Sequence, residues 1–130
     1  MVPRRASPGR MLARGLARRC PRCGQGGLFT RWFRMVECCP RCGYRFEREE
    51  GFFLGALVVN FGVTEGLLLV VAIVPFIALH AAGRSPDTAT FVAAALAAAV
   101  VGPIAFYPFS RTTWAAIDLV MHGSPEDRSE

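Results

Sequence analysis

The chain has 130 residues, 52% of them hydrophobic, and a formal net charge of +5. One small domain and two membrane-spanning helices would use nearly all of this length. The charge is uneven, because residues 1–50 hold 12 of the 15 basic residues and four of the 10 acidic ones, whereas residues 51–130 are net acidic.

Residues 1–19 are rich in arginine and contain Pro3, Pro8 and Gly9. We predict an arm without fixed structure here, with one helical turn at residues 11–16. Its positive charge would attract the anionic head groups of a lipid bilayer, at about 1 kcal/mol for each arginine near the surface. The only apolar run, residues 11–17, is short and interrupted by Arg14, so we expect no secretory signal peptide.

The string Cys-Pro-Arg-Cys-Gly occurs at residues 20–24 and again at residues 39–43. Paired C-x2-C motifs separated by 15 residues are typical of a four-thiolate metal site, which predicts four ligands: Cys20, Cys23, Cys39 and Cys42. The odd total of five cysteines argues against a disulfide framework, although redox-active or unpaired thiols remain an alternative. Cys38 is either a spare thiol or a ligand that exchanges with Cys39.

Zinc is the expected metal, because four-cysteine sites are normally structural and closed. The two Cys-Pro-Arg-Cys-Gly strings are called the knuckles below. Iron is the alternative, since knuckles of the form C-P-x-C-G also resemble those of rubredoxins. Residues 20–46 would form a small zinc-ribbon-like β module, with Gly24 and Gly43 at positive φ and a short hairpin within residues 28–36. A module of this size has too little hydrophobic core to fold alone, so metal binding would supply its folding free energy.

Residues 52–122 are predicted to form a transmembrane α-hairpin. The run 52–82 contains one charged residue, Glu65, and the run 91–109 contains none. These runs predict spans at about residues 52–81 and 91–110. An amphipathic extension would continue to residue 122, with an apolar face at Trp114, Ile117 and Met121. The polar tail at residues 123–130 is expected to lack fixed structure.

The distribution of arginine predicts the orientation of the hairpin. Twelve arginines precede the first span, whereas the loop between the spans contains only Arg84. The positive-inside rule therefore places both termini in the cytoplasm of a multi-pass membrane protein. That compartment is reducing and keeps thiolates available to a metal.

The first span contains polar and small residues. Asn60, Thr64 and Glu65 would form an intramembrane polar face, used either as a proton or ion relay or as a structural hydrogen-bonding surface at a helix interface. Gly62 and Gly66 form a GxxxG string with Gly55 one heptad earlier, and small residues of this kind permit close helix packing. Because two helices cannot hide such a face from lipid, we expect a homo-oligomer or a membrane-protein partner.

Three segments together resemble a known family: residues 20–29 with the first knuckle, residues 39–43 with the second, and the bridge Phe-Glu-Arg-Glu-Glu-Gly-Phe-Phe-Leu-Gly-Ala at residues 46–56. They are similar to the bacterial membrane proteins grouped as domain of unknown function 983, over roughly residues 18–122. The resemblance implies a protein of the bacterial inner membrane with a cytoplasmic zinc-ribbon-like head. It implies no activity, and it gives Cys38 no role.

The sequence favours an accessory, scaffold or assembly factor for a membrane complex, with a membrane-tethered carrier of iron, metal or electrons as the alternative. We do not expect an enzyme, because no nucleophile–base pair and no open metal position is visible. Arginines and aromatic residues alternate through the head as they do in some nucleic-acid-binding ribbons. The adjacent membrane spans favour contact with anionic lipid instead, so nucleic acid is an unlikely partner.

Overall fold

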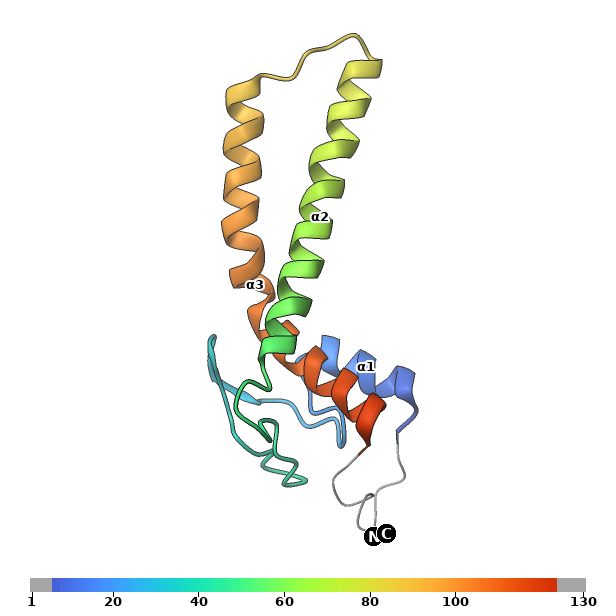
Figure 1. The fold of residues 1–130 in the computed structure, drawn as a ribbon, viewed down its shortest axis with the longest axis vertical. Helices are drawn as coiled ribbons and strands as arrows, with labels where there is room; N and C mark the ends of the chain where they lie inside the picture. The colour runs from blue at the N-terminus through green and yellow to red at the C-terminus, as the bar shows by residue number, and fades with distance from the viewer. Residues whose placement is uncertain (1–5, 124–130) are drawn as a thin grey trace. The chain divides into compact units, whose positions relative to one another are not determined.

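The computed structural model describes residues 6–123, so the expectations for residues 1–5 and 124–130 lie outside the described part. Figure 1 shows the order of the elements: α1 (Pro8–Leu16), β1 (Phe29–Arg31), β2 (Arg34–Met35), α2 (Leu54–Ala81) and α3 (Thr88–His122). The chain divides into two compact units, a head unit made of residues 1–59 and 107–130 and a hairpin unit made of residues 60–106.

The hairpin unit consists of the apolar parts of α2 and α3, which run side by side and are joined by a short loop (Figure 1). Both helices are long and apolar enough to cross a membrane, and only 11% and 0% of their most apolar stretches are buried inside the protein. A core helix of a soluble protein would bury its apolar side chains. The exposed side chains of α2 and α3 instead match the environment that a bilayer provides, as the sequence predicted.

Polar and small residues hold the two helices of the hairpin unit together. The Asn60 side chain, 3% exposed, donates a hydrogen bond of 3.0 Å from Nδ2 to the carbonyl oxygen of Pro103. One turn later, the Thr64 hydroxyl donates to the carbonyl oxygen of Asn60 at 2.7 Å, and a Cβ on Gly102 would lie 3.6 Å from that of Thr64. In an apolar environment, such a side-chain hydrogen bond between helices fixes their register.

The head unit contains the predicted β-hairpin. β1 and β2 are antiparallel, with Phe29 opposite Met35 and Arg31 opposite Arg34. The pairing continues past the strands, because the amide of Val36 donates to the carbonyl oxygen of Leu28 at 2.8 Å. An isolated bridge joins Cys38 to Arg45.

The core of the head unit combines the cysteine-rich module with the C-terminal part of α3. Its buried members are Cys20, Leu28, Cys39, Tyr44, Phe46, Ala115 and Leu119. The predicted module at residues 20–46 therefore does not close its core alone. The segment after Tyr107, which was expected to extend the membrane hairpin, contributes one side of the core of the head.

One face of α3 packs in the core of the head unit. Four residues at spacings of 3, 4 and 7 are buried, namely Thr112, Ala115, Ala116 and Leu119, whereas Met121 is 69% exposed. The amphipathic face predicted at Trp114, Ile117 and Met121 is not among these buried residues and stays a prediction. Small residues form the packed face because they allow neighbouring backbone to approach closely.

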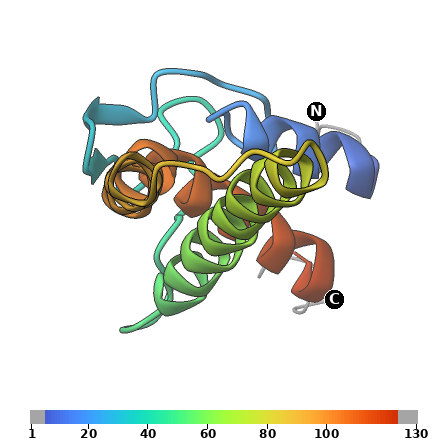
Figure 2. The same ribbon diagram turned by 90° about the horizontal axis from the view of Figure 1, so that it is seen from above.

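The N-terminal segment differs from the expected arm, because residues 8–16 form the helix α1 rather than a single turn. Figure 2 shows α1 beside the C-terminal part of α3. A Cβ on Gly15 would lie 2.8 Å from the Cβ of Ala116, and the hydroxyl of Thr112 donates to the carbonyl oxygen of Gly15 at 2.6 Å. The prediction failed because this contact depends on a glycine and distant small residues, which leave little trace in local apolar periodicity.

Candidate metal centre

The two cysteine knuckles have the same backbone structure. In the first, the amide of Cys20 donates to the carbonyl oxygen of Gln25 and the amide of Gly24 to that of Cys20, both at 2.8 Å. In the second, the amides of Cys39 and Gly43 make the corresponding bonds to Tyr44 and Cys39, both at 2.9 Å.

The glycines that end the knuckles confirm the prediction of positive φ. Gly24 has φ 81° and Gly43 has φ 71°, in the left-handed region that glycine adopts without strain. The repeated sequence thus produces a repeated turn, and each turn directs two cysteine side chains to one side.

The four cysteine sulfurs converge. The Sγ atoms of Cys20, Cys23, Cys39 and Cys42 all lie within 4.8 Å of one another. The Sγ atoms of Cys20 and Cys42 are 3.8 Å apart, and those of Cys23 and Cys39 are 3.5 Å apart. A tetrahedral ion with metal–sulfur bonds of about 2.3 Å requires sulfur–sulfur distances of about 3.8 Å. The donor set therefore fits a four-coordinate thiolate metal, and both zinc and iron satisfy this geometry.

The cysteine thiols differ in their ease of ionisation. Burial raises the pKa of Cys20 far above its ordinary value, and burial also raises the pKa of Cys42. Burial acts on Cys39 in the same direction, but hydrogen bonds from the backbone of Cys42 and Arg41 lower the pKa of Cys39 overall. Because a metal binds thiolates, loading the site displaces protons, and affinity should fall as the pH falls.

Cys38 does not join the cluster. Its side chain is exposed, whereas that of the adjacent Cys39 is buried, because successive residues of an extended segment point in opposite directions. Among the described residues, the metal-ligating group contains the other four cysteines and not Cys38. The structure thus places Cys38 outside the set of ligands.

The second knuckle is tied to α3 by a polar contact. Arg48 donates hydrogen bonds of 2.8 Å to the hydroxyl of Tyr44 and to the Oδ2 of Asp118. The Asp118 side chain is 14% exposed, so this ion pair is partly shielded from water. The first knuckle is tied to α1, because Arg14 donates to the carbonyl oxygen of Arg22 at 3.1 Å. The four clustered cysteines therefore lie in a segment that is linked to both α1 and α3.

The residues predicted to form the intramembrane polar face separate into two groups. Asn60 and Thr64 lie at the contact with α3 described above. Glu65 is exposed and does not take part in that contact. The three glycines also differ. Gly55 lies so close to the Trp114 ring that a Cβ would overlap it, but a Cβ on Gly62 or Gly66 would have no neighbour within 4 Å.

Sequence comparison shows the family. The sequence model described as "Protein of unknown function (DUF983)" matches residues 29–118, which is 90 of the 130 residues. The chain belongs to the DUF983 family. The matched region of this DUF983 chain contains the second knuckle and both long helices, and it begins after Cys20 and Cys23. No curated protein and no solved structure matches the chain.

Sequence reasoning missed the buried face of α3 that packs beside the cysteines of this DUF983 chain. The sequence did contain a pattern for this face. It consists of four residues at helical spacing: Thr112, Ala115, Ala116 and Leu119. Because three of these residues are small, hydropathy did not distinguish this face from its neighbours. The Arg48–Asp118 pair spans 70 residues and has no local pattern at all.

We predict that Cys20→Ser abolishes stoichiometric metal binding, whereas Cys38→Ser does not. Serine cannot replace a thiolate in a closed four-sulfur site, and Cys20 is fully buried, so its loss removes a ligand and part of the core. Metal per chain is measured by plasma mass spectrometry on both purified variants. A Cys38→Ser variant that loses metal while Cys20→Ser retains it would refute the assigned ligand set.

Proposed function

We propose that this DUF983 protein is an accessory, scaffold or assembly factor of a bacterial inner membrane, with its metal-binding head and both termini in the cytoplasm. One observation carries the proposal: Cys20 and Cys39 share a buried core with Ala115 and Leu119 at the end of the second apolar helix. A metal at the cysteines would therefore fix the head directly to the segment that leaves the membrane.

A structural role for the metal follows from the chemistry of its ligands. Four thiolates complete a tetrahedral shell, which leaves no position for a substrate or a water nucleophile. We therefore propose that zinc is the metal and that the protein is not an enzyme. The cytoplasmic placement rests on the twelve arginines before α2 and on the need for reduced thiols.

The alternative is a membrane-tethered iron protein that carries electrons. It is favoured by the similarity between these knuckles and those of rubredoxins, and by the partial burial of Cys23 and Cys42, which leaves a route for electrons to the surface. Iron in four-thiolate coordination changes oxidation state, whereas zinc does not.

The identity of the metal distinguishes these two functions. For protein purified in mild detergent without added metal, we predict about one zinc per chain and no visible absorption bands. Plasma mass spectrometry and an absorption spectrum measure both quantities. Stoichiometric iron with thiolate-to-iron charge-transfer bands would refute the structural zinc proposal and establish the electron carrier.

We further propose that a second copy of the chain covers the face of α2 that carries Glu65. This carboxyl lies about 16 Å along the helix from Leu54, near the middle of a span, where a charge costs about 2.5–3.5 kcal/mol. Gly62 and Gly66 flank it without close neighbours, so the backbone of another helix can approach.

The oligomer proposal predicts that Gly62→Leu converts an oligomer into a monomer, because the bulky side chain blocks close approach. Val63→Leu, a change at a neighbouring exposed position of the same helix, serves as the control. Native mass spectrometry of the detergent-purified chains gives the number of copies. A wild-type chain that is monomeric at every accessible concentration would contradict the proposal and favour a different membrane protein as the partner.

A further inference from the structure

Arg18 has unusual surroundings in the head unit. It is the only described non-glycine residue with positive φ, at 58°. Its guanidinium carbon lies 5.0 Å from the ring centre of Phe29, 5.1 Å from that of Trp32 and 5.6 Å from that of Phe109. The left-handed backbone and the three rings together hold the cation in one position.

The Arg18 side chain still lacks an acceptor for one of its donors. Its Nε atom is buried and has no hydrogen-bond partner among the described residues. Aromatic faces attract the charge of a guanidinium, but they leave its directional N–H donors unsatisfied. A buried donor without an acceptor costs about 1–3 kcal/mol, so an oxygen-bearing ligand at this point would stabilise the structure.

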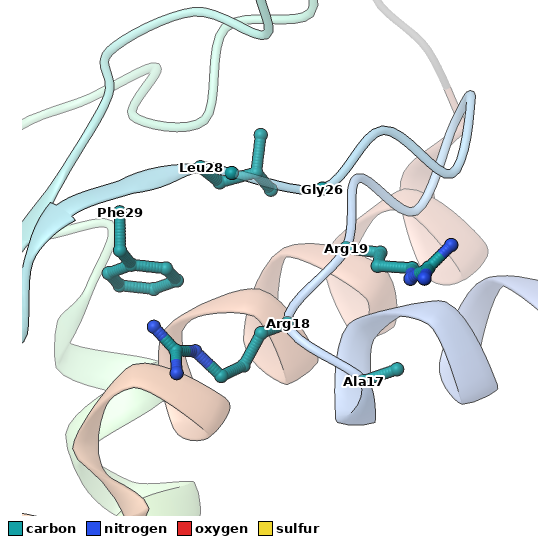
Figure 3. Close-up of a pocket in the computed structure, with 7 residues that line it drawn as sticks. Ala17, Arg18, Arg19, Gly26, Leu28 and Phe29 are labelled. Atoms are coloured by element: carbon teal, nitrogen blue, oxygen red, sulfur yellow. The ribbon is translucent and has the colours of Figure 1, made fainter.

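A cavity adjoins this arginine. It has a volume of about 240 Å³ and is lined by residues 17–19 and 26–29. The lining includes the cations Arg18 and Arg19 but no carboxylate, and Gly26 and Gly27 leave the backbone on one side bare. Figure 3 shows the Arg18 side chain directed toward Phe29, whereas that of Arg19 extends in the opposite direction. The chemistry of the cavity suits an anion that is held chiefly by Arg18.

The rings around Arg18 lie beside the C-terminal end of the uncharged run of α3. Phe109 ends the uncharged run of α3, and two residues earlier the ring of Tyr107 contacts that of Phe33 at 5.0 Å. Trp32 and Phe33, at the turn of the β-hairpin, are 43% and 54% exposed. Exposed aromatic residues beside the end of a membrane span are typical of the belt at the level of the lipid head groups.

We propose that Arg18 and this cavity bind the phosphate of an anionic phospholipid, with Trp32 beside the lipid. The site rests on the proposed membrane anchoring of the protein and adds to it one specific lipid contact. The guanidinium offers a planar fork of donors that matches two phosphate oxygens, and its Nε supplies the donor that is now unsatisfied. Free phosphate shares this chemistry, but at the end of a membrane span the phosphates present at high concentration are those of lipids.

Trp32 provides a direct reporter of the site. The chain contains two tryptophans, so Trp114→Phe leaves Trp32 as the only one. The full-length, metal-loaded variant is placed in nanodiscs of neutral lipid that contain increasing fractions of brominated phosphatidylglycerol or brominated phosphatidylcholine. We predict half-quenching of Trp32 at a roughly tenfold lower fraction of the anionic lipid, the effect expected of one charge-assisted hydrogen-bonding pair.

Two arginine variants test the assignment to Arg18. We predict that Arg18→Gln removes the preference for the anionic lipid, whereas Arg19→Gln, which changes the charge equally, retains most of it. Metal per chain serves as the folding control for both. Because the lipid preference of the Trp114→Phe chain is measured without any change at Arg18, equal quenching by the two lipids would overturn the proposal even if Arg18→Gln failed to fold.

The remaining outcomes separate the site from the proposed function. A change in Trp32 fluorescence on adding inorganic phosphate, together with equal quenching by the two brominated lipids, would assign the cavity to free phosphate and overturn the lipid site. Protection of Trp32 by a short RNA, without an effect of phosphate, would overturn it in favour of nucleic acid. Quenching by neither brominated lipid would contradict membrane anchoring itself, whereas equal quenching by both would leave anchoring intact and remove only the site.

Discussion

Four thiolates that must meet at one point constrain the whole head of this DUF983 protein. The two knuckles are 19 residues apart in sequence, and each brings two sulfurs to the cluster through the same pair of backbone hydrogen bonds. The shared core is small, and Cys20 and Cys39 are part of it. A metal bound at the four cysteines would therefore provide the cross-link that a hydrophobic core of this size cannot provide alone.

The same constraint explains why α3 extends past its apolar stretch. The knuckles leave one side of the core open, and Ala115 and Leu119 close it. Arg48 and Asp118 then link the second knuckle to α3, while Thr112 and Gly15 link α3 to α1. The helix thus has two environments along its length: an exposed apolar part in the hairpin unit and a part buried against the cysteine-rich segment in the head unit.

Local patterns in the sequence predicted much of this structure. The spacing of the cysteines predicted the cluster, Gly24 and Gly43 predicted the left-handed turns, and the uncharged runs predicted two long apolar helices. Each of these patterns can be seen in one short stretch of sequence or in a motif that occurs twice. The family resemblance agreed with the match over residues 29–118.

What the sequence did not reveal depends on contacts between distant segments. The packing of α1 needs Gly15 to meet Thr112, 97 residues away, and no local periodicity marks such a pair. The buried face of α3 was missed because alanine and threonine carry little hydropathy signal. The GxxxG string predicted close helix packing at Gly62 and Gly66. Within one chain, however, α2 contacts α3 through Asn60 and Thr64, and the two glycines have no close neighbour.

If a metal at the four cysteines and the end of α3 form one cooperative unit, removal of the metal by a chelator should loosen both. Hydrogen–deuterium exchange before and after the chelator is added measures this. We expect residues 20–46 and 107–122 to lose protection together, while residues 91–106 keep theirs. Unchanged protection of residues 107–122 in metal-free protein would contradict it, because the end of α3 would then fold without the cluster.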